Sequence, residues 1–180
     1  NPNPGWGKGQ IPCFPAGTLI SVNQGFAQIQ DIKIGDKVKA FNFQTRRVVE
    51  NSVTDIYRGQ TDTWVIIYTK KSKIRATKHH PIWIESDNKW EDAEKVIPGM
   101  ALRLEDGNEV IVEKVETTLL GKAEETFNFS VEGVNNYFAG EERILVHNDD
   151  KTRFARGNFR NYHLMDNAGN IFNHCHYCRI

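Results

Sequence analysis

Short apolar runs, rich in β-branched and aromatic residues, alternate with turn sequences from Thr18 to about Val146. The clearest runs are 19–22, 38–41, 64–68, 101–104, 110–115, 127–131 and 144–146. Many β-branched runs at turn-length spacing predict an all-β domain. Helical periodicity is weak throughout, and single turns at 29–34 and 93–97 are the best helical candidates.

The same pattern repeats weakly within the chain. A shift of 64 positions, from Ile29 to Ala93 and from Gly35 to Gly99, aligns apolar with apolar and turn with turn residues. This shift also lays Cys13 on Thr77. We therefore expect two copies of one β-unit related by a pseudo-two-fold axis, with the start of each copy near a common centre.

A single cysteine, Cys13, stands just before the first apolar run. A thiolate is a strong nucleophile, and this one could attack the carbonyl carbon of Pro12 to replace the peptide bond with a thioester. The step needs an acid that protonates the departing amide nitrogen, and His80 is the candidate. Thr77, three residues earlier, could hold the scissile bond by a hydrogen bond.

A second candidate site lies at the other end of the apolar region, where His147 precedes Asn148. The side-chain amide nitrogen of Asn148 could attack its own backbone carbonyl, which would form a succinimide and release the amine of Asp149. His147 could donate a proton to that leaving nitrogen. Taken with Cys13, these residues are the parts needed to cut the chain's own backbone twice.

The order of these motifs resembles that of the Hint superfamily, which comprises inteins, hedgehog autoprocessing domains and bacterial intein-like domains. The resemblance covers residues 13–148. Within the superfamily, this segment is most similar to the pretoxin Hint domains of bacterial polymorphic toxins. The segments that carry it are 13–19, 29–38, 76–81, 127–133, 136–138 and 145–148. It implies a horseshoe-like all-β Hint fold with internal pseudo-two-fold symmetry and an autocatalytic, single-turnover cleavage activity.

Three positions depart from the pattern of splicing inteins. Asp149 stands where inteins carry Cys, Ser or Thr to accept the acyl group, so we expect cleavage after Asn148 as the main outcome instead of splicing. Asn128 stands where many inteins have Asp, and Asn136 replaces a frequent His.

The resemblance implies three segments. Residues 1–12 would be a linker from an upstream protein, 13–148 the self-processing domain, and 149–180 a C-terminal toxin or effector fragment. The substrate would be the chain's own flanking polypeptide. The whole protein would be a large exported or cell-surface bacterial protein, although this sequence contains no targeting signal of its own.

The charge composition bears on which partners other than the chain itself are expected. Lys plus Arg and Asp plus Glu balance at 23 each, which gives no reason to expect nucleic acid as a partner of residues 13–148, or a membrane. We expect a monomer without a cofactor in this domain. In the tail, Cys175 and Cys178 form a C-x-x-C that supplies half of a zinc site. An immunity protein or nucleic acid would be a partner of the complete effector.

Two other functions fit the same residues. Cys13 and His80 could serve a cysteine hydrolase or transferase that acts on other molecules, which would leave the bond after Asn148 intact. Alternatively, the chain could be a non-catalytic β binding module with a buried Cys13. Incubation followed by intact mass measurement distinguishes the three.

Overall fold

The computed structural model describes residues 12–147, 164–165 and 171–172. These residues are almost entirely β-structure, which confirms the predicted all-β class. Two short 3-10 turns, η1 (Ile29–Asp31) and η2 (Ala93–Lys95), lie at the two places where single helical turns were expected. Among the described residues, no helix is both long enough and apolar enough to cross a membrane.

Two sheets make up the domain. The strands of the first are β1 (Phe14–Pro15), β11 (Lys114–Val131), β5 (Arg47–Tyr68), β4 (Lys37–Asn42) and β6 (Lys73–Ala76). The strands of the second are β10 (Glu109–Ile111), β9 (Ala101–Arg103), β7 (Pro81–Ile84), β8 (Lys89–Asp92), β13 (Ile144–His147), β12 (Asn136–Ala139), β2 (Leu19–Val22) and β3 (Gly25–Gln28). A separate pair, β14 (Leu164–Met165) with β15 (Ile171–Phe172), follows.

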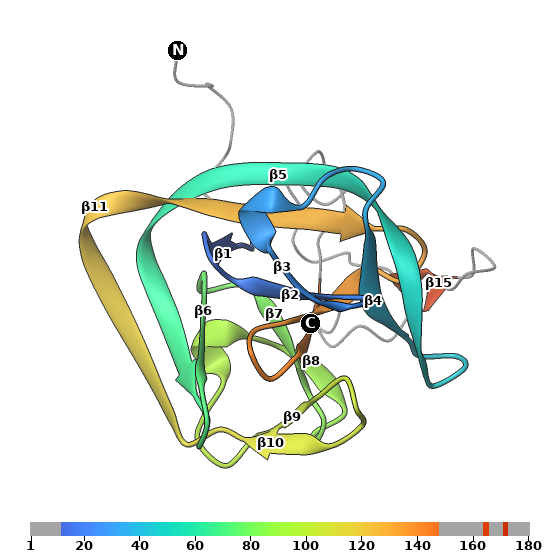
Figure 1. The fold of residues 1–180 in the computed structure, drawn as a ribbon. Coiled ribbons are helices and arrows are strands. Elements are labelled where there is room, and N and C mark those ends of the chain that lie inside the picture. Colours follow the sequence, from blue (N-terminus) through green and yellow to red (C-terminus); the bar gives the residue numbers. More distant parts are fainter. Residues whose placement is uncertain (1–11, 148–163, 166–170, 173–180) are drawn as a thin grey trace.

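Two long strands, β5 and β11, form the outer arch of the domain. They pair antiparallel from Lys114 opposite Tyr68 to Val131 opposite Val53, with shifts in register between Leu119 and Glu124 and between Ser130 and Val131. In Figure 1 they curve together around the smaller strands. Their apolar ends were predicted, but their exposed middle sections were not, because polar side chains facing water on both sides of a ribbon leave no alternating apolar signal.

The predicted run 110–115 is not one strand. It ends as β10 at Ile111 and resumes as β11 at Lys114, with Val112 and Glu113 between them. The Val112 amide donates to the Met100 carbonyl and the Glu113 amide to the Tyr68 carbonyl. The chain changes sheets at this point, which local β-propensity cannot reveal.

The 64-residue repeat is present in the backbone. The β3–η1 and β8–η2 segments have bounds that differ by that shift, and Gly35 and Gly99 share a φ of 93°. A turn hydrogen bond in each copy, Asp36 to Lys33 and Met100 to Ile97, is also related by it. The hairpin registers differ, because Leu19 pairs with Gln28 whereas Trp83 pairs with Trp90.

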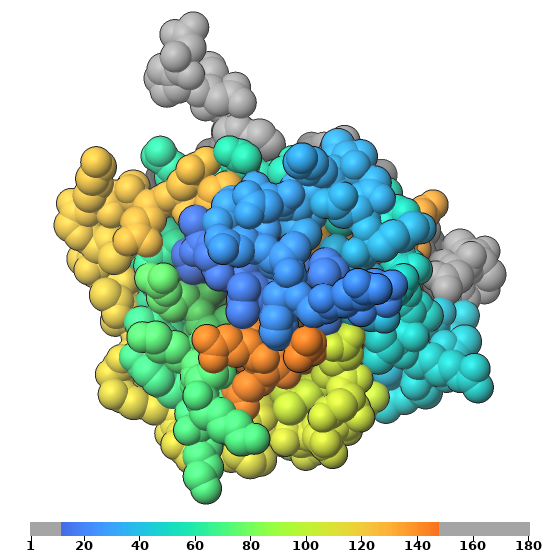
Figure 2. Space-filling model, viewed as in Figure 1, coloured from blue at the N-terminus to red at the C-terminus, as the bar shows by residue number. Residues whose placement is uncertain are grey.

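The C-terminal hairpin β12–β13 lies in the middle of the molecule. Ala139 pairs with Ile20 of β2, and Val146 pairs with Ile82 of β7. In Figure 2 the turn of this hairpin (orange) lies between the N-terminal strands (blue) and the segment around residue 105 (yellow-green). Because strands lie on both sides of this hairpin, all four residues of β12 and all four of β13 are buried.

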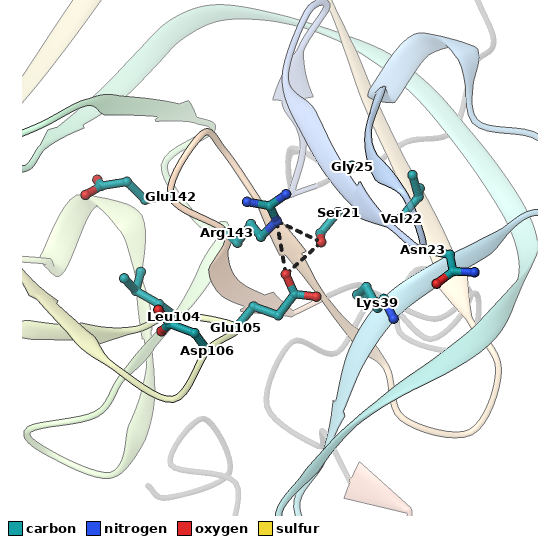
Figure 3. A pocket seen from close by; sticks show the side chains of 10 residues that line it. All are labelled: Ser21, Val22, Asn23, Gly25, Lys39, Leu104, Glu105, Asp106, Glu142 and Arg143. Carbon is teal, nitrogen blue, oxygen red and sulfur yellow. Dashed lines mark hydrogen bonds and ion pairs between the residues drawn. The ribbon is translucent and has the colours of Figure 1, made fainter.

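A polar cluster fastens that turn to its neighbours. The Arg143 Nε lies 3.1 Å from a Glu105 oxygen and 3.3 Å from the Ser21 hydroxyl, and Ser21 donates to the same carboxylate. These side chains line a hollow of about 380 Å³ (Figure 3). The guanidinium also lies over the Phe26 ring at 4.0 Å. Its charge is therefore matched within the cluster, which serves to join β2, β3 and the hairpin turn.

Candidate active site

Cys13 lies just before β1 and is completely buried. Its backbone amide donates to the Thr77 hydroxyl oxygen at 2.8 Å, and the Thr77 amide donates to the Cys13 carbonyl at 3.0 Å. Residues 64 positions apart are thus joined by two hydrogen bonds. The nitrogen of the Pro12–Cys13 peptide bond is held by one of the two residues that sequence reasoning assigned to it.

The oxygen of the same peptide bond is held by Asn128. The Asn128 Nδ2 donates to the Pro12 carbonyl at 2.6 Å, and its Oδ1 accepts from the Phe129 amide and from the Tyr137 hydroxyl, each at 2.8 Å. Because an N–H and an O–H both donate to Oδ1, the amide can face the Pro12 carbonyl only with its NH2 group. The Tyr137 ring also stacks on Phe129, with centroids 4.2 Å apart.

This arrangement provides a donor for an oxyanion. When a nucleophile attacks a carbonyl carbon, negative charge develops on the oxygen, and an oriented donor in a buried site stabilises that charge. Asn128 is only 1% exposed, so its hydrogen bond is shielded from water. An aspartate at this position, once ionised, could not donate. The departure from the intein pattern therefore supplies a donor where an acceptor is frequent.

His80 is completely buried beside the segment that carries Cys13. Its imidazole packs on the ring of Phe14, the next residue after Cys13, with centroids 4.0 Å apart. Its amide donates to the Thr77 carbonyl at 3.1 Å, and its carbonyl accepts from the Ala93 amide at 2.9 Å. The turn that presents Thr77 to the Cys13 nitrogen thus also fixes the backbone of His80.

His147 ends β13 and is 3% exposed. Its ring packs nearly perpendicular to that of Trp90, with centroids 5.0 Å apart and an interplanar angle of 82°. Since Val146 pairs antiparallel with Ile82, the chain runs at His147 towards the start of β7, which directly follows His80. The structure therefore brings the strand that precedes the second predicted cleavage point to the strand that follows the Thr77–His80 turn.

Four predicted residues lie outside the described part of the chain. They are Asn148, Asp149, Cys175 and Cys178. Their predicted roles in cyclisation, in release of the amine and in zinc binding remain predictions.

Asn136 has a structural role. Its Oδ1 accepts from the Phe41 amide at 2.7 Å, and its Nδ2 donates to the carbonyls of Phe41 at 2.8 Å and Val134 at 3.0 Å. Both ends of the side-chain amide are therefore used to fasten β12 to β4. The residue that pairs with His147 across the hairpin is a rigid support.

Sequence reasoning missed the contributions of Tyr137 and Phe14. Neither lies in a predicted apolar run; they fall in the segments 13–19 and 136–138 that carry the resemblance, where an aromatic residue by itself signals core packing and nothing more. Tyr137 is as fully buried as a core phenylalanine, yet its hydroxyl orients Asn128. The hydroxyl of a buried tyrosine usually needs a hydrogen-bond partner, and this requirement could have indicated from the sequence that Tyr137 contacts a polar side chain.

The fold and the residues around Pro12–Cys13 define a Hint domain, the class of self-processing domains that includes inteins. Residues 19–149 match the family described as the pretoxin HINT domain. The match spans most of the chain, so the protein belongs to the pretoxin HINT family. No curated protein matches the chain.

Solved structures show the same fold. A bacterial intein-like domain from Clostridium thermocellum is 31% identical, with a TM-score of 0.74 over 77% of this chain and 100% of that chain. A DnaB intein from Synechocystis sp. PCC 6803 is 22% identical, with a TM-score of 0.65 over 77% of this chain and 99% of that chain. The gp41-1 intein is 19% identical, with a TM-score of 0.63 over 77% and 100%. The last two comparisons concern the fold alone.

Proposed function

We propose that this domain cuts its own backbone at Pro12–Cys13 and after Asn148, and so releases a C-terminal effector. The observation that carries the proposal is that both polar atoms of the Pro12–Cys13 peptide are hydrogen-bonded to side chains. The Cys13 nitrogen donates to Thr77, and the Pro12 oxygen accepts from Asn128. A bond held at both atoms beside a buried thiol is ready for attack. Any buried backbone N–H and C=O require partners; what supports the proposal is that both partners here are polar side chains from distant segments, one of which can donate to a developing oxyanion.

The first reaction is an N–S acyl shift. The Cys13 thiolate attacks the Pro12 carbonyl carbon, and Asn128 donates to the oxygen as it becomes negative. His80 gives a proton to the Cys13 nitrogen, the C–N bond breaks, and a thioester and a free amine result. Water or an added thiol then attacks the thioester carbonyl, which frees residues 1–12 as an acid or a new thioester and regenerates the Cys13 thiol.

Thr77 acts on this step as a positioning residue. Its hydroxyl oxygen accepts from the Cys13 N–H, which fixes the rotation of the peptide plane relative to the thiol. Holding reacting groups in one geometry lowers the entropic part of the barrier. The same turn carries His80, so the acid and the peptide nitrogen are positioned by one short segment.

The second reaction is cyclisation of Asn148. Its side-chain nitrogen attacks its own carbonyl carbon, a succinimide forms, and the amine of Asp149 leaves with a proton from His147. The burial of His147 against Trp90 supports this role, because a buried, packed imidazole has a defined position. Asp149 offers no hydroxyl or thiol to accept an acyl group, so cleavage prevails over splicing.

The family description adds a context. A pretoxin domain belongs to a toxin protein, and we propose that residues 149–180 are part of the effector, carried by an exported or cell-surface bacterial protein. Zinc at Cys175 and Cys178, and an immunity protein or nucleic acid as the partner of the full effector, remain proposals for that segment.

The test is the mass of the purified chain after incubation, with and without dithiothreitol. We expect loss of residues 149–180 without thiol and loss of residues 1–12 with it. Cys13→Ala should abolish the second product and spare the first, and Asn148→Ala should do the reverse. A ligated 1–12 plus 149–180 peptide as the dominant product would contradict the proposal. Turnover of an added substrate, with all wild-type chains intact, would favour the hydrolase alternative.

A further inference from the structure

A cluster of three metal-ligating side chains lies beside the Thr77–His80 turn. The Nδ1 of His79 is 3.5 Å from Asp92 Oδ2 and 3.4 Å from Glu94 Oε1, and the three ligand atoms all lie within 4.8 Å of one another. His79 is about half exposed, so an ion from solvent can reach it. The reactions described above use none of these three residues.

The spacing suits a small divalent ion. Zinc binds imidazole nitrogen and carboxylate oxygen at about 2.0–2.1 Å, which places two ligands of a tetrahedral site about 3.4 Å apart. The two distances from His79 Nδ1 match that separation with little movement. One imidazole with two carboxylates is also a donor set that first-row divalent metals accept.

Charge favours a cation at this place. Two carboxylates that flank one imidazole carry more negative charge than a single imidazolium can neutralise. Lys95 lies 3.7 Å from Asp92, but its side chain is 63% exposed. The Asp92 side chain, by contrast, is only 10% exposed, and a charge–charge attraction is stronger where water is largely excluded. A divalent ion would balance both carboxylates at once.

The backbone holds the cluster in place before any ion binds. The Glu94 amide donates to the Lys78 carbonyl at 3.0 Å, and the Ala93 amide donates to the His80 carbonyl at 2.9 Å. Asp92 ends β8 opposite Pro81, the first residue of β7. The two segments that supply ligands are therefore already fastened together, and binding costs little ordering.

We propose that His79, Asp92 and Glu94 form a site for a divalent transition metal of the zinc class, with water in the remaining position. The ion would cross-link the turn that carries His80 to the η2 turn. This site is independent of the tail cysteines, and it does not depend on the cleavage chemistry.

The test uses the full chain without other thiols and without self-cleavage. The background carries Cys13→Ala, Cys175→Ser, Cys178→Ser and Asn148→Ala. Zinc chloride is titrated by calorimetry, cobalt chloride is followed by visible absorption, and Tm is measured with zinc at a hundredfold excess over Kd. We expect a zinc site in this background, cobalt absorption bands of a four-coordinate ion, and a rise in Tm of roughly 5–10 °C.

Single substitutions identify the ligands. His79→Gln and Glu94→Gln should each weaken zinc binding at least tenfold and remove most of the Tm shift. Glu91→Gln is the matched control, because Glu91 is the neighbour of Asp92 in sequence but its carboxylate pairs with Lys89. This substitution should leave the zinc affinity and the Tm shift unchanged. Unchanged zinc affinity in both ligand variants would overturn the proposal, as would absence of a Tm shift in the background chain.

Discussion

Asn128 donates its side-chain amide to the carbonyl oxygen of Pro12 at 2.6 Å, across 116 positions of sequence. The contact joins β11 to the residue before the candidate nucleophile. The donor is oriented by Phe129 and Tyr137, so it is in position before any reaction begins. An oxyanion donor needs this property, because a donor that must first reorganise stabilises less of the developing charge.

Replacement of Asn128 by Ala should slow thiol-induced loss of residues 1–12 by about 10²–10³-fold, the usual effect of removing one oxyanion donor. Tyr137→Phe is the matched comparison. It removes one of two groups that orient the amide and should slow the same step by no more than about tenfold, since the Phe129 amide remains. The rate is read from intact mass against time. A wild-type rate in the alanine variant would eliminate this role.

Thr77→Val should slow the same N-terminal step, because the methyl group cannot accept the hydrogen bond from the Cys13 amide. A lost hydrogen bond of about 1–1.5 kcal/mol corresponds to roughly tenfold in rate. Thr77→Ser retains the hydroxyl and should restore most of the rate. If serine and valine variants behave alike, the hydroxyl does not position the scissile bond. Tail release serves as the internal reference in each measurement.

His147→Ala should slow release of residues 149–180 by about 10²–10⁴-fold, as expected for loss of a positioned acid. Thiol-induced loss of residues 1–12 should change much less, because the first step uses other groups. Trp90→Leu is a useful companion, since it removes the ring packed on His147 while keeping an apolar side chain. Equal slowing of both cuts by His147→Ala would indicate a damaged fold instead of a lost acid.

Ile82→Ala should lower the free energy of unfolding by about 2–5 kcal/mol, because Ile82 is completely buried where β7 meets β13. Ile97→Ala is the control. Its side chain is 57% exposed, and its loss should change stability by about 0.5 kcal/mol or less. Urea denaturation of the chain with Cys13→Ala and Asn148→Ala gives both values. Similar losses at the two positions would contradict the assigned core.

Local pattern was enough for the class of fold. β-branched runs predicted strands, and weak helical periodicity predicted a single helical turn at each of the two places where the 3-10 turns lie, because these signals depend on near neighbours in the chain. The long middle sections of β5 and β11 were beyond such reasoning. Most of their residues are polar, many are exposed, and they extend as strands where the two long ribbons pair with each other.

The residues of the candidate site divide in the same way. The sequence alone determined which side chains have suitable chemistry, since a thiol, two histidines and an asparagine are identified by type and order. Tertiary structure decided what Asn128 does: sequence marked it as a departure from a pattern, and the fold placed it on the Pro12 carbonyl. It also made Asn136 a structural support. Such roles depend on contacts between distant segments, and these exist only once β1, β11 and β12 have packed.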